Sequence, residues 1–283
     1  MLPGYDLMGL VIGSEGQLGI VTEATVRILR APEGARPMLL GFDSSEAAGQ
    51  CVAAIIGAGI IPVAIEFMDR PAIQVCEAFA KAGYPLDVEA LLIIEVEGSN
   101  EEIADLLNVI ARHRQAASPR RCCASARARS RAPRSGRAAR RRSAPSAASP
   151  TTTAWTASSR SASSARCWSP SRHICDKHGL QVANIFHAGD GNLHPLVLYD
   201  ANDAAQAERA EQAGDEILEL CVALGGCLTG EHGVGIEKRD LMRVQFTADR
   251  PRRCRCGSRR VFDPEVAAQP GQGLSRSRAA TRR

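Results

Sequence analysis

The spacing of apolar positions changes several times along this chain, and the changes predict a series of strands and helices. Short apolar runs alternate with stretches in which apolar residues return every three or four positions. The predicted strands are 39–43, 63–68, 91–96, 182–186 and 193–199. The predicted helices begin at Ser44 or Ser45, at Pro71 and at Ser99, and a longer one covers about 204–224. This alternation indicates a layered α/β or α+β domain.

Helix-capping residues support these boundaries. Ser99 is followed three positions later by Glu102, which is the spacing of a capping box. Proline is favoured in the first turn of a helix, as at Pro71. Gly57 and Gly225 stand where two of the apolar periods end, and glycine commonly ends helices.

A glycine-rich segment stands between two further apolar stretches near the start of the chain. The first runs from Leu10 to Ile12, and in the second apolar and polar residues alternate from Ile20 to Ile28. Gly13, Gly16 and Gly19 separate the two. The pattern predicts a strand, a tight loop and a second strand.

Between Arg114 and Ser171 this regular pattern stops. The stretch has no acidic residue and consists almost entirely of Arg, Ala, Ser, Pro, Thr and Cys. One interpretation is a basic disordered linker that binds an anionic partner such as nucleic acid. The other is translation of a GC-rich gene in a shifted frame. We favour the shifted frame, because lysine is absent and Trp155 and Trp168 are the only aromatic residues available for base stacking.

Charge and cysteine content add little to this picture. The formal net charge of +4 comes from arginines crowded into that stretch and into the residues after Phe246. The ten cysteines have no regular spacing, and we find no signal peptide and no apolar run long enough to span a bilayer. A reducing cytoplasm therefore fits best. Cys254 and Cys256 lie in arginine-rich sequence without a folded shell, so we do not expect them to bind metal.

Two histidines flank a predicted turn in the segment from His187 to His194. Asp190 and Gly191 form a favoured two-residue hairpin turn, which would place the two histidines opposite one another on paired strands. Cross-strand Cβ atoms lie about 4.5 to 5.5 Å apart, so both imidazoles could reach one metal ion. For this pair alone, two strand-end histidines bonded to backbone remain an equal alternative.

A second polar motif follows the long helix, between Thr229 and Gly235. Glu231 offers an oxygen ligand, and two histidines with one carboxylate leave coordination positions open for a substrate. His232 would then be available as a base. The glycines on either side let the backbone approach a ligand closely.

The chain resembles the vanillyl-alcohol-oxidase-type, FAD-linked oxidases, and among them glycolate oxidase D subunits and D-lactate dehydrogenases. Three stretches carry the resemblance: GYDLMGLVIGSEGQLGIVTEATVRIL, HAGDGNLHPLVLYD and LTGEHGVGIEKRDLM. It covers residues 2–113 and 173–246. The fold that it implies is α+β, an antiparallel sheet covered by helices that forms a cap domain, preceded by the last strands of an FAD-binding domain that is otherwise missing.

The resemblance divides the chain into five parts. We expect a remnant of the FAD-binding domain in 1–36, the cap domain in 37–113 and 173–247, a disordered anomalous stretch in 114–172 and an anomalous tail in 248–283.

The resemblance also assigns residues to an active site. The FAD-contacting loop would consist of Gly13, Ser14, Glu15, Gly16, Gln17, Leu18, Gly19 and Ile20. The ligands of a divalent metal of the Zn, Mn or Fe type would be His187, His194 and Glu231. His232 would be the catalytic base, and Asn192 would help to shape the substrate pocket.

The implied function is oxidation of a D-2-hydroxy acid, such as glycolate or D-lactate, to the 2-oxo acid with hydride transfer to the flavin. This fragment is expected to be inactive alone. The implied partners are other subunits of a glycolate-oxidase-like complex or a quinone or other electron carrier, in the cytoplasm or at the periphery of the inner membrane, with no nucleic acid. The alternative is a metal-binding α/β module whose basic insert binds an anionic partner.

Overall fold

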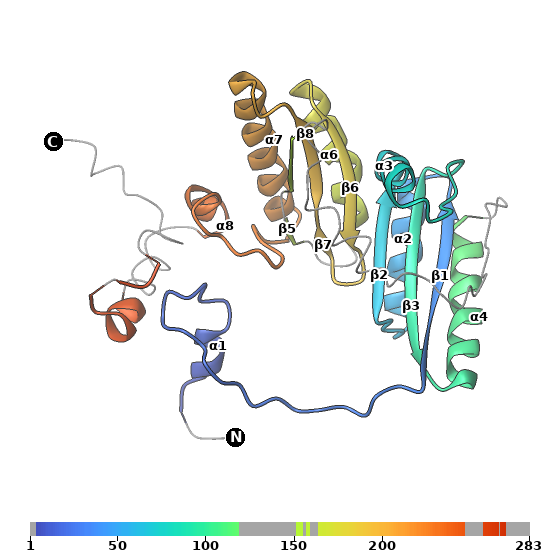
Figure 1. Ribbon diagram of the computed structural model, residues 1–283, viewed down its shortest axis with the longest axis horizontal. Coiled ribbons are helices and arrows are strands. Elements are labelled where there is room, and N and C mark those ends of the chain that lie inside the picture. The colour runs from blue at the N-terminus through green and yellow to red at the C-terminus, as the bar shows by residue number, and fades with distance from the viewer. Residues whose placement is uncertain are drawn as a thin grey trace.

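The computed structural model describes residues 4–118, 151–154, 157–158, 164–246, 257–265 and 267–269. Within these ranges the chain forms an eight-stranded antiparallel sheet with helices packed against it (Figure 1). The strand order is β1-β3-β2-β6-β7-β5, and β8 pairs with both β6 and β4. The predicted α+β fold with an antiparallel sheet is confirmed.

The strands are β1 (Gly34–Phe42), β2 (Ala64–Asp69), β3 (Ala90–Gly98), β4 (Thr151–Ala154), β5 (Ala157–Ser158), β6 (Gln181–His187), β7 (Asn192–Leu193) and β8 (Pro195–Tyr199). The helices are α1 (Leu7–Val11), α2 (Ser45–Gly57), α3 (Arg70–Ala80), α4 (Asn100–Ala117), α6 (Ser164–Lys177), α7 (Ala204–Ala223), the 3-10 helix η3 (Arg239–Leu241) and α8 (Met242–Gln245). A further short helix covers 257–262.

Side chains cap the helices where the sequence predicted helix starts. Ser44 accepts a hydrogen bond from the Ala47 N–H at the start of α2. Ser99 and Glu102 form the full capping box of α4, with each side chain bonded to the backbone N–H of the other residue. At α3, Asp69 supplies the cap and proline follows in the first turn, so the helix begins one residue earlier than expected.

The two faces of the sheet are covered differently. On one face α2, α4, α6 and α7 bury the main core. Its largest fully buried side chains are Leu40, Phe42, Ile55, Phe67, Leu92, Ile94, Ile103, Ile110, Phe186 and Leu193. The other face carries α3, which packs on Met68, Leu91 and Ala183 in a smaller cluster. Figure 1 shows α3 on the opposite side of β2 from α2.

The predicted strand pair near the start of the chain is wrong. The first apolar run forms part of the short helix α1, and no strand is present in 20–33. Ile20 and Ile28 are 90% and 86% exposed. In the described part of the chain this segment lies beside no other strand (Figure 1), and an isolated strand has nothing to satisfy its backbone hydrogen bonds.

Helices and strands cover parts of the stretch 114–172, for which we predicted disorder. Arg114 is buried in α4 and donates to the Gly41 carbonyl oxygen at 3.2 Å. Ser118 donates to Asp43 at 2.7 Å. Strands β4 and β5 and the first half of α6 also fall in this stretch, and the threonines of β4 have high strand propensity. Residues 119–150, 155–156 and 159–163 of this stretch lie outside the described residues. So do residue 247 of the predicted cap domain and 248–256, 266 and 270–283 of the predicted tail.

Among the helices that the structure describes, none is at once long and apolar enough to cross a bilayer.

Asp215, among the acidic residues of α7, should make the free energy of unfolding depend on pH. Partial burial, with Glu211 and Glu219 one turn away on either side, raises the pKa of Asp215 from 3.8 to about 6. The folded state therefore favours the protonated carboxyl, and its ionisation destabilises the fold progressively as the pH rises from about 4 to 6. We expect Asp215→Asn to raise the free energy of unfolding by about 1 to 2 kcal/mol at pH 7 and to change it little at pH 4.

Urea unfolding at both pH values measures this difference. Asp105→Asn, at an exposed position of α4, is the matched control and should have little effect at either pH. Equal effects of Asp215→Asn at pH 4 and pH 7 would contradict the prediction.

Candidate metal centre

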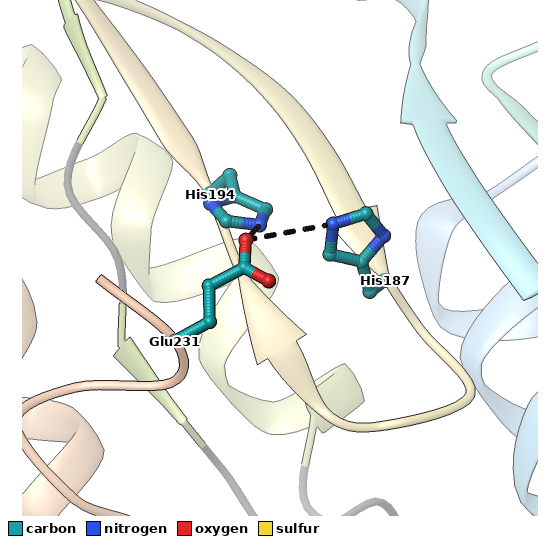
Figure 2. A group of neighbouring side chains, drawn as sticks. All are labelled: His187, His194 and Glu231. Atoms are coloured by element: carbon teal, nitrogen blue, oxygen red, sulfur yellow. Dashed lines mark ion pairs between the residues drawn. The ribbon is translucent and has the colours of Figure 1, made fainter. Parts of the chain in front are cut away.

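Three side chains with metal-binding atoms converge from separate parts of the fold. His187 ends β6, His194 lies between β7 and β8, and Glu231 lies in the loop after α7. Glu231 Oε1 is 3.1 Å from His194 Nε2 and 3.7 Å from His187 Nε2 (Figure 2). The donor atoms all lie within 4.8 Å of one another. The structure thus brings together the ligand set that the sequence predicts.

The hairpin that carries the two histidines has a different register from the predicted one. His187 pairs with Asn192, and the Ile185 N–H points to the carbonyl oxygen of His194 at 3.5 Å. The turn therefore has four residues, 188–191, instead of two. Because side chains alternate between faces, a shift of two positions leaves both imidazoles on the same face. Their ring centroids are 4.9 Å apart.

Contacts with the neighbouring strand account for the longer turn. The Gly189 N–H donates to the Ile65 carbonyl oxygen of β2 at 3.2 Å, which extends the pairing of β6 with β2 into the turn. Gly191 has φ +72°, a left-handed conformation that glycine adopts without strain. The turn is thus bonded to the sheet.

Glu66 of β2 is a part of the site that sequence reasoning missed. It stands directly across from His187 in the β2–β6 pairing. Both carboxylate oxygens lie 2.9 Å from His187 Nδ1, which leaves Nε2 facing Glu231. A carboxylate behind a ligating histidine fixes its ring orientation and tautomer. The available signal was a lone acid inside an otherwise apolar predicted strand.

The two histidines have different proton affinities. The hydrogen bond that His187 Nδ1 donates to the Glu66 carboxylate is the main cause that raises the pKa of His187. Burial, followed by the nearby His187, lowers the pKa of His194 to about 4. His194 is therefore neutral at physiological pH, as a metal-ligating imidazole must be.

His232 stands beside the three possible ligands but is more accessible. Its Nε2 is 3.6 Å from Glu231 Oε1, and its ring centroid is 5.4 Å from that of His194. The side chain is 53% exposed, compared with 13% for His194. This position allows His232 to contact a small molecule at the centre.

Asn192 lies beneath the centre and is almost completely buried. Its Nδ2 is 3.3 Å from His194 Nε2, while its Oδ1 is buried without a hydrogen-bond partner in the described residues. A Cβ atom at Gly230 would lie only 1.8 Å from this Oδ1. Glycine at 230 therefore lets the loop before Glu231 pass over Asn192.

The predicted FAD-contacting loop reaches this region through Glu15. The Glu15 carboxylate accepts hydrogen bonds from the Val234 and Gly235 N–H groups at 2.7 and 2.9 Å. The loop itself is a compact turn, in which the Gln17 N–H donates to the Ser14 carbonyl oxygen. At its end Ile20 points into solvent. The structure thus joins the loop to the motif after Glu231.

Comparison with known proteins agrees with this architecture. The family described as FAD linked oxidases, C-terminal domain, matches residues 31–272. The chain belongs to this family. It therefore shares the C-terminal domain of FAD-linked oxidases, as the resemblance implied.

Relatives include the glycolate oxidase subunit GlcD of Escherichia coli K12, which is 39% identical over 288 residues, covering 96% of this chain and 54% of the relative. GlcD of Bacillus subtilis is 35% identical, with 95% and 57% covered. A probable mitochondrial D-lactate dehydrogenase of Danio rerio is 29% identical, with 98% and 56% covered. The chain thus spans about half the length of these relatives.

Solved structures of low sequence identity share the fold. Alkyldihydroxyacetonephosphate synthase superposes with a TM-score of 0.63 at 15% identity, covering 95% of this chain and 49% of that protein. A p-cresol methylhydroxylase with substrate bound gives 0.61 at 14% identity, with 86% and 53% covered. These similarities support the fold of the FAD-linked oxidase domain.

Proposed function

We propose that this chain carries the metal-binding and substrate-binding half of an FAD-linked centre that oxidises a D-2-hydroxy acid of the glycolate or D-lactate type. The convergence of His187, His194 and Glu231 beside His232 is the observation that carries the proposal. The names of the relatives, glycolate oxidase and D-lactate dehydrogenase, support this substrate class.

The donor set fits a divalent metal ion. Two imidazole nitrogens and one carboxylate oxygen suit Zn, Mn or Fe and leave coordination positions open. Glu66 holds the His187 ring from behind, and His194 is neutral. When bound, the ion would supply a Lewis acid that polarises the hydroxyl group of the substrate.

The residues around these ligands would position the substrate and move one proton. His232, which is half exposed, would accept the substrate hydroxyl proton as general base. Glu231 Oε1, 3.6 Å from His232 Nε2, would stabilise the imidazolium that results. The buried amide of Asn192 would form the floor of the pocket.

The loop from Gly13 to Ile20 would contribute FAD contacts to the same centre. Its glycines Gly13 and Gly16 have φ +78° and +72° and expose the backbone to a close ligand. Glu15 in this loop accepts a hydrogen bond from the Val234 N–H, which would connect the flavin contacts to the metal ligands. FAD, when bound, would supply the two-electron acceptor. One loop is a small part of a flavin site, so we expect the chain alone to be inactive.

Substrate binding by the metal-loaded chain tests the proposal. D-lactate and glycolate should bind to the full chain in the presence of Mn²⁺ and at least about tenfold more weakly without it, because their hydroxyl and carboxylate groups would both contact the ion. The measurement is the change in water proton relaxation of bound Mn²⁺ on titration with each acid. Propionate, which lacks the hydroxyl group, is the control ligand.

Two outcomes would count against this function. D-lactate that fails to bind, or that binds equally well without metal, would remove the metal-centred substrate site. Dye reduction by the chain with FAD and D-lactate would instead contradict the expectation that the chain alone is inactive.

Electron transfer to further subunits or to a quinone, and a cytoplasmic location, remain part of the proposal. The alternative module depends on a basic insert that falls largely in residues 119–150, outside the described residues.

A further inference from the structure

The side chain of Glu15 connects the N-terminal segment to the loop 231–238 through two hydrogen bonds. Its two oxygens accept from two consecutive backbone N–H groups, Val234 at 2.7 Å and Gly235 at 2.9 Å. These groups follow Glu231 by three and four residues. Hydrogen bonds to an ionised carboxylate are roughly twice as strong as neutral ones.

The backbone of Glu15 is in an uncommon conformation, and on the other side of the contact only glycine leaves room for its side chain. Glu15 has φ +53°, in the left-handed region that non-glycine residues seldom adopt. Gly233 has φ +84°, and a Cβ atom there would lie 2.9 Å from Glu15 Cδ. Such strain persists where the surrounding structure determines the conformation, and it is concentrated at functional sites.

A buried cation accompanies the contact. Lys238 is 4% exposed, and Glu15 is one of the anionic groups that interact with it electrostatically. The Lys238 N–H also donates to the Val234 carbonyl oxygen at 3.1 Å. Glu15 thus interacts with two parts of one loop, the amides at 234–235 and the lysine that follows.

We propose that Glu15 is a positioning residue that couples the glycine-rich loop 13–19 to the loop 231–238, and thereby holds Glu231 and His232 in place. The inference rests on the metal centre proposed above and adds a dependence between two sites. A ligand that orders loop 13–19 strengthens metal binding, and metal strengthens the binding of that ligand by the same factor, as linkage requires.

The test compares the affinity of the full chain for Mn²⁺ in three forms. Glu15→Gln should weaken Mn²⁺ binding by about tenfold, as is typical when the support of a ligand is lost. Gly233→Ala, which displaces Glu15 from the other side, should weaken it similarly. Glu23→Gln, at an exposed position of the same segment, should bind as the unmodified chain does. Electron paramagnetic resonance of free Mn²⁺ gives the dissociation constants.

Hydrogen exchange in the metal-free chain separates this inference from the metal centre itself. Glu15→Gln should accelerate exchange of the amides in 231–238 and leave β3 unchanged. If the unmodified chain binds no Mn²⁺, the proposed metal centre is wrong. Hydrogen exchange of the amides in 231–238 then decides the coupling between the two loops. Faster exchange in Glu15→Gln would support this coupling, and unchanged exchange would overturn it. If the chain binds Mn²⁺ and Glu15→Gln keeps its affinity, the coupling is overturned.

Discussion

Replacing His194 with alanine should reduce the affinity of the chain for Mn²⁺ or Zn²⁺ by more than about 100-fold, beyond the usual loss when only the support of a ligand is removed. His194 is the least exposed of the three donors, at 13%, and its Nε2 lies 3.1 Å from Glu231 Oε1. Its removal leaves one imidazole and one half-exposed carboxylate. Isothermal titration of the metal-free chain measures the change.

Variants of Glu66 test whether the loss of metal affinity follows the role of each residue in the centre. Glu66→Ala should weaken binding by about 10- to 100-fold, because His187 keeps its nitrogen but loses the carboxylate that orients it. Glu66→Gln should lose less, since an amide oxygen can still accept from His187 Nδ1. His113→Ala, on α4 and outside the centre, is the control. Equal affinities of His194→Ala and the unmodified chain would rule out the proposed ligand set.

Phe67→Ala should lower the free energy of unfolding by about 3 to 5 kcal/mol, the usual cost of emptying a fully buried aromatic site. Phe67 is 0% exposed, and its ring stacks on that of Phe186 with centroids 5.4 Å apart. These rings face each other across the β2–β6 pairing, where the two halves of the sheet meet. The neighbouring Glu66–His187 pair should therefore also loosen, and metal affinity should fall.

Urea unfolding of the full chain measures the stability change. Phe79→Ala, in α3 with a side chain 63% exposed, is the matched control and should cost less than about 1 kcal/mol. A loss below about 1 kcal/mol for Phe67→Ala would show that the two halves of the sheet do not depend on this pair.

The local sequence was enough to predict most helices and strands of this domain. It was also enough to name His187, His194 and Glu231, the side chains that converge in the fold. The periods of apolar residues and the caps at Ser44 and Ser99 depend on neighbours within a few positions, so they could be recognised without coordinates. The two-residue error in the hairpin register did not separate His187 from His194, because alternation of side chains preserves the face. Thus the three converging side chains could be named although the register of the hairpin was wrong.

Only the tertiary structure decided the features that depend on partners distant in sequence. The alternating segment after Gly19 is not a strand, because no strand lies beside it in the described part of the chain. The turn before Asn192 is lengthened by a bond to β2, and Glu66 supports His187 only because β2 and β6 are neighbours. Glu15 reaches Val234 across 219 positions. Backbone pairing and charge contacts of this kind arise from the folded arrangement, whereas periodicity along the chain reports only which face each residue occupies.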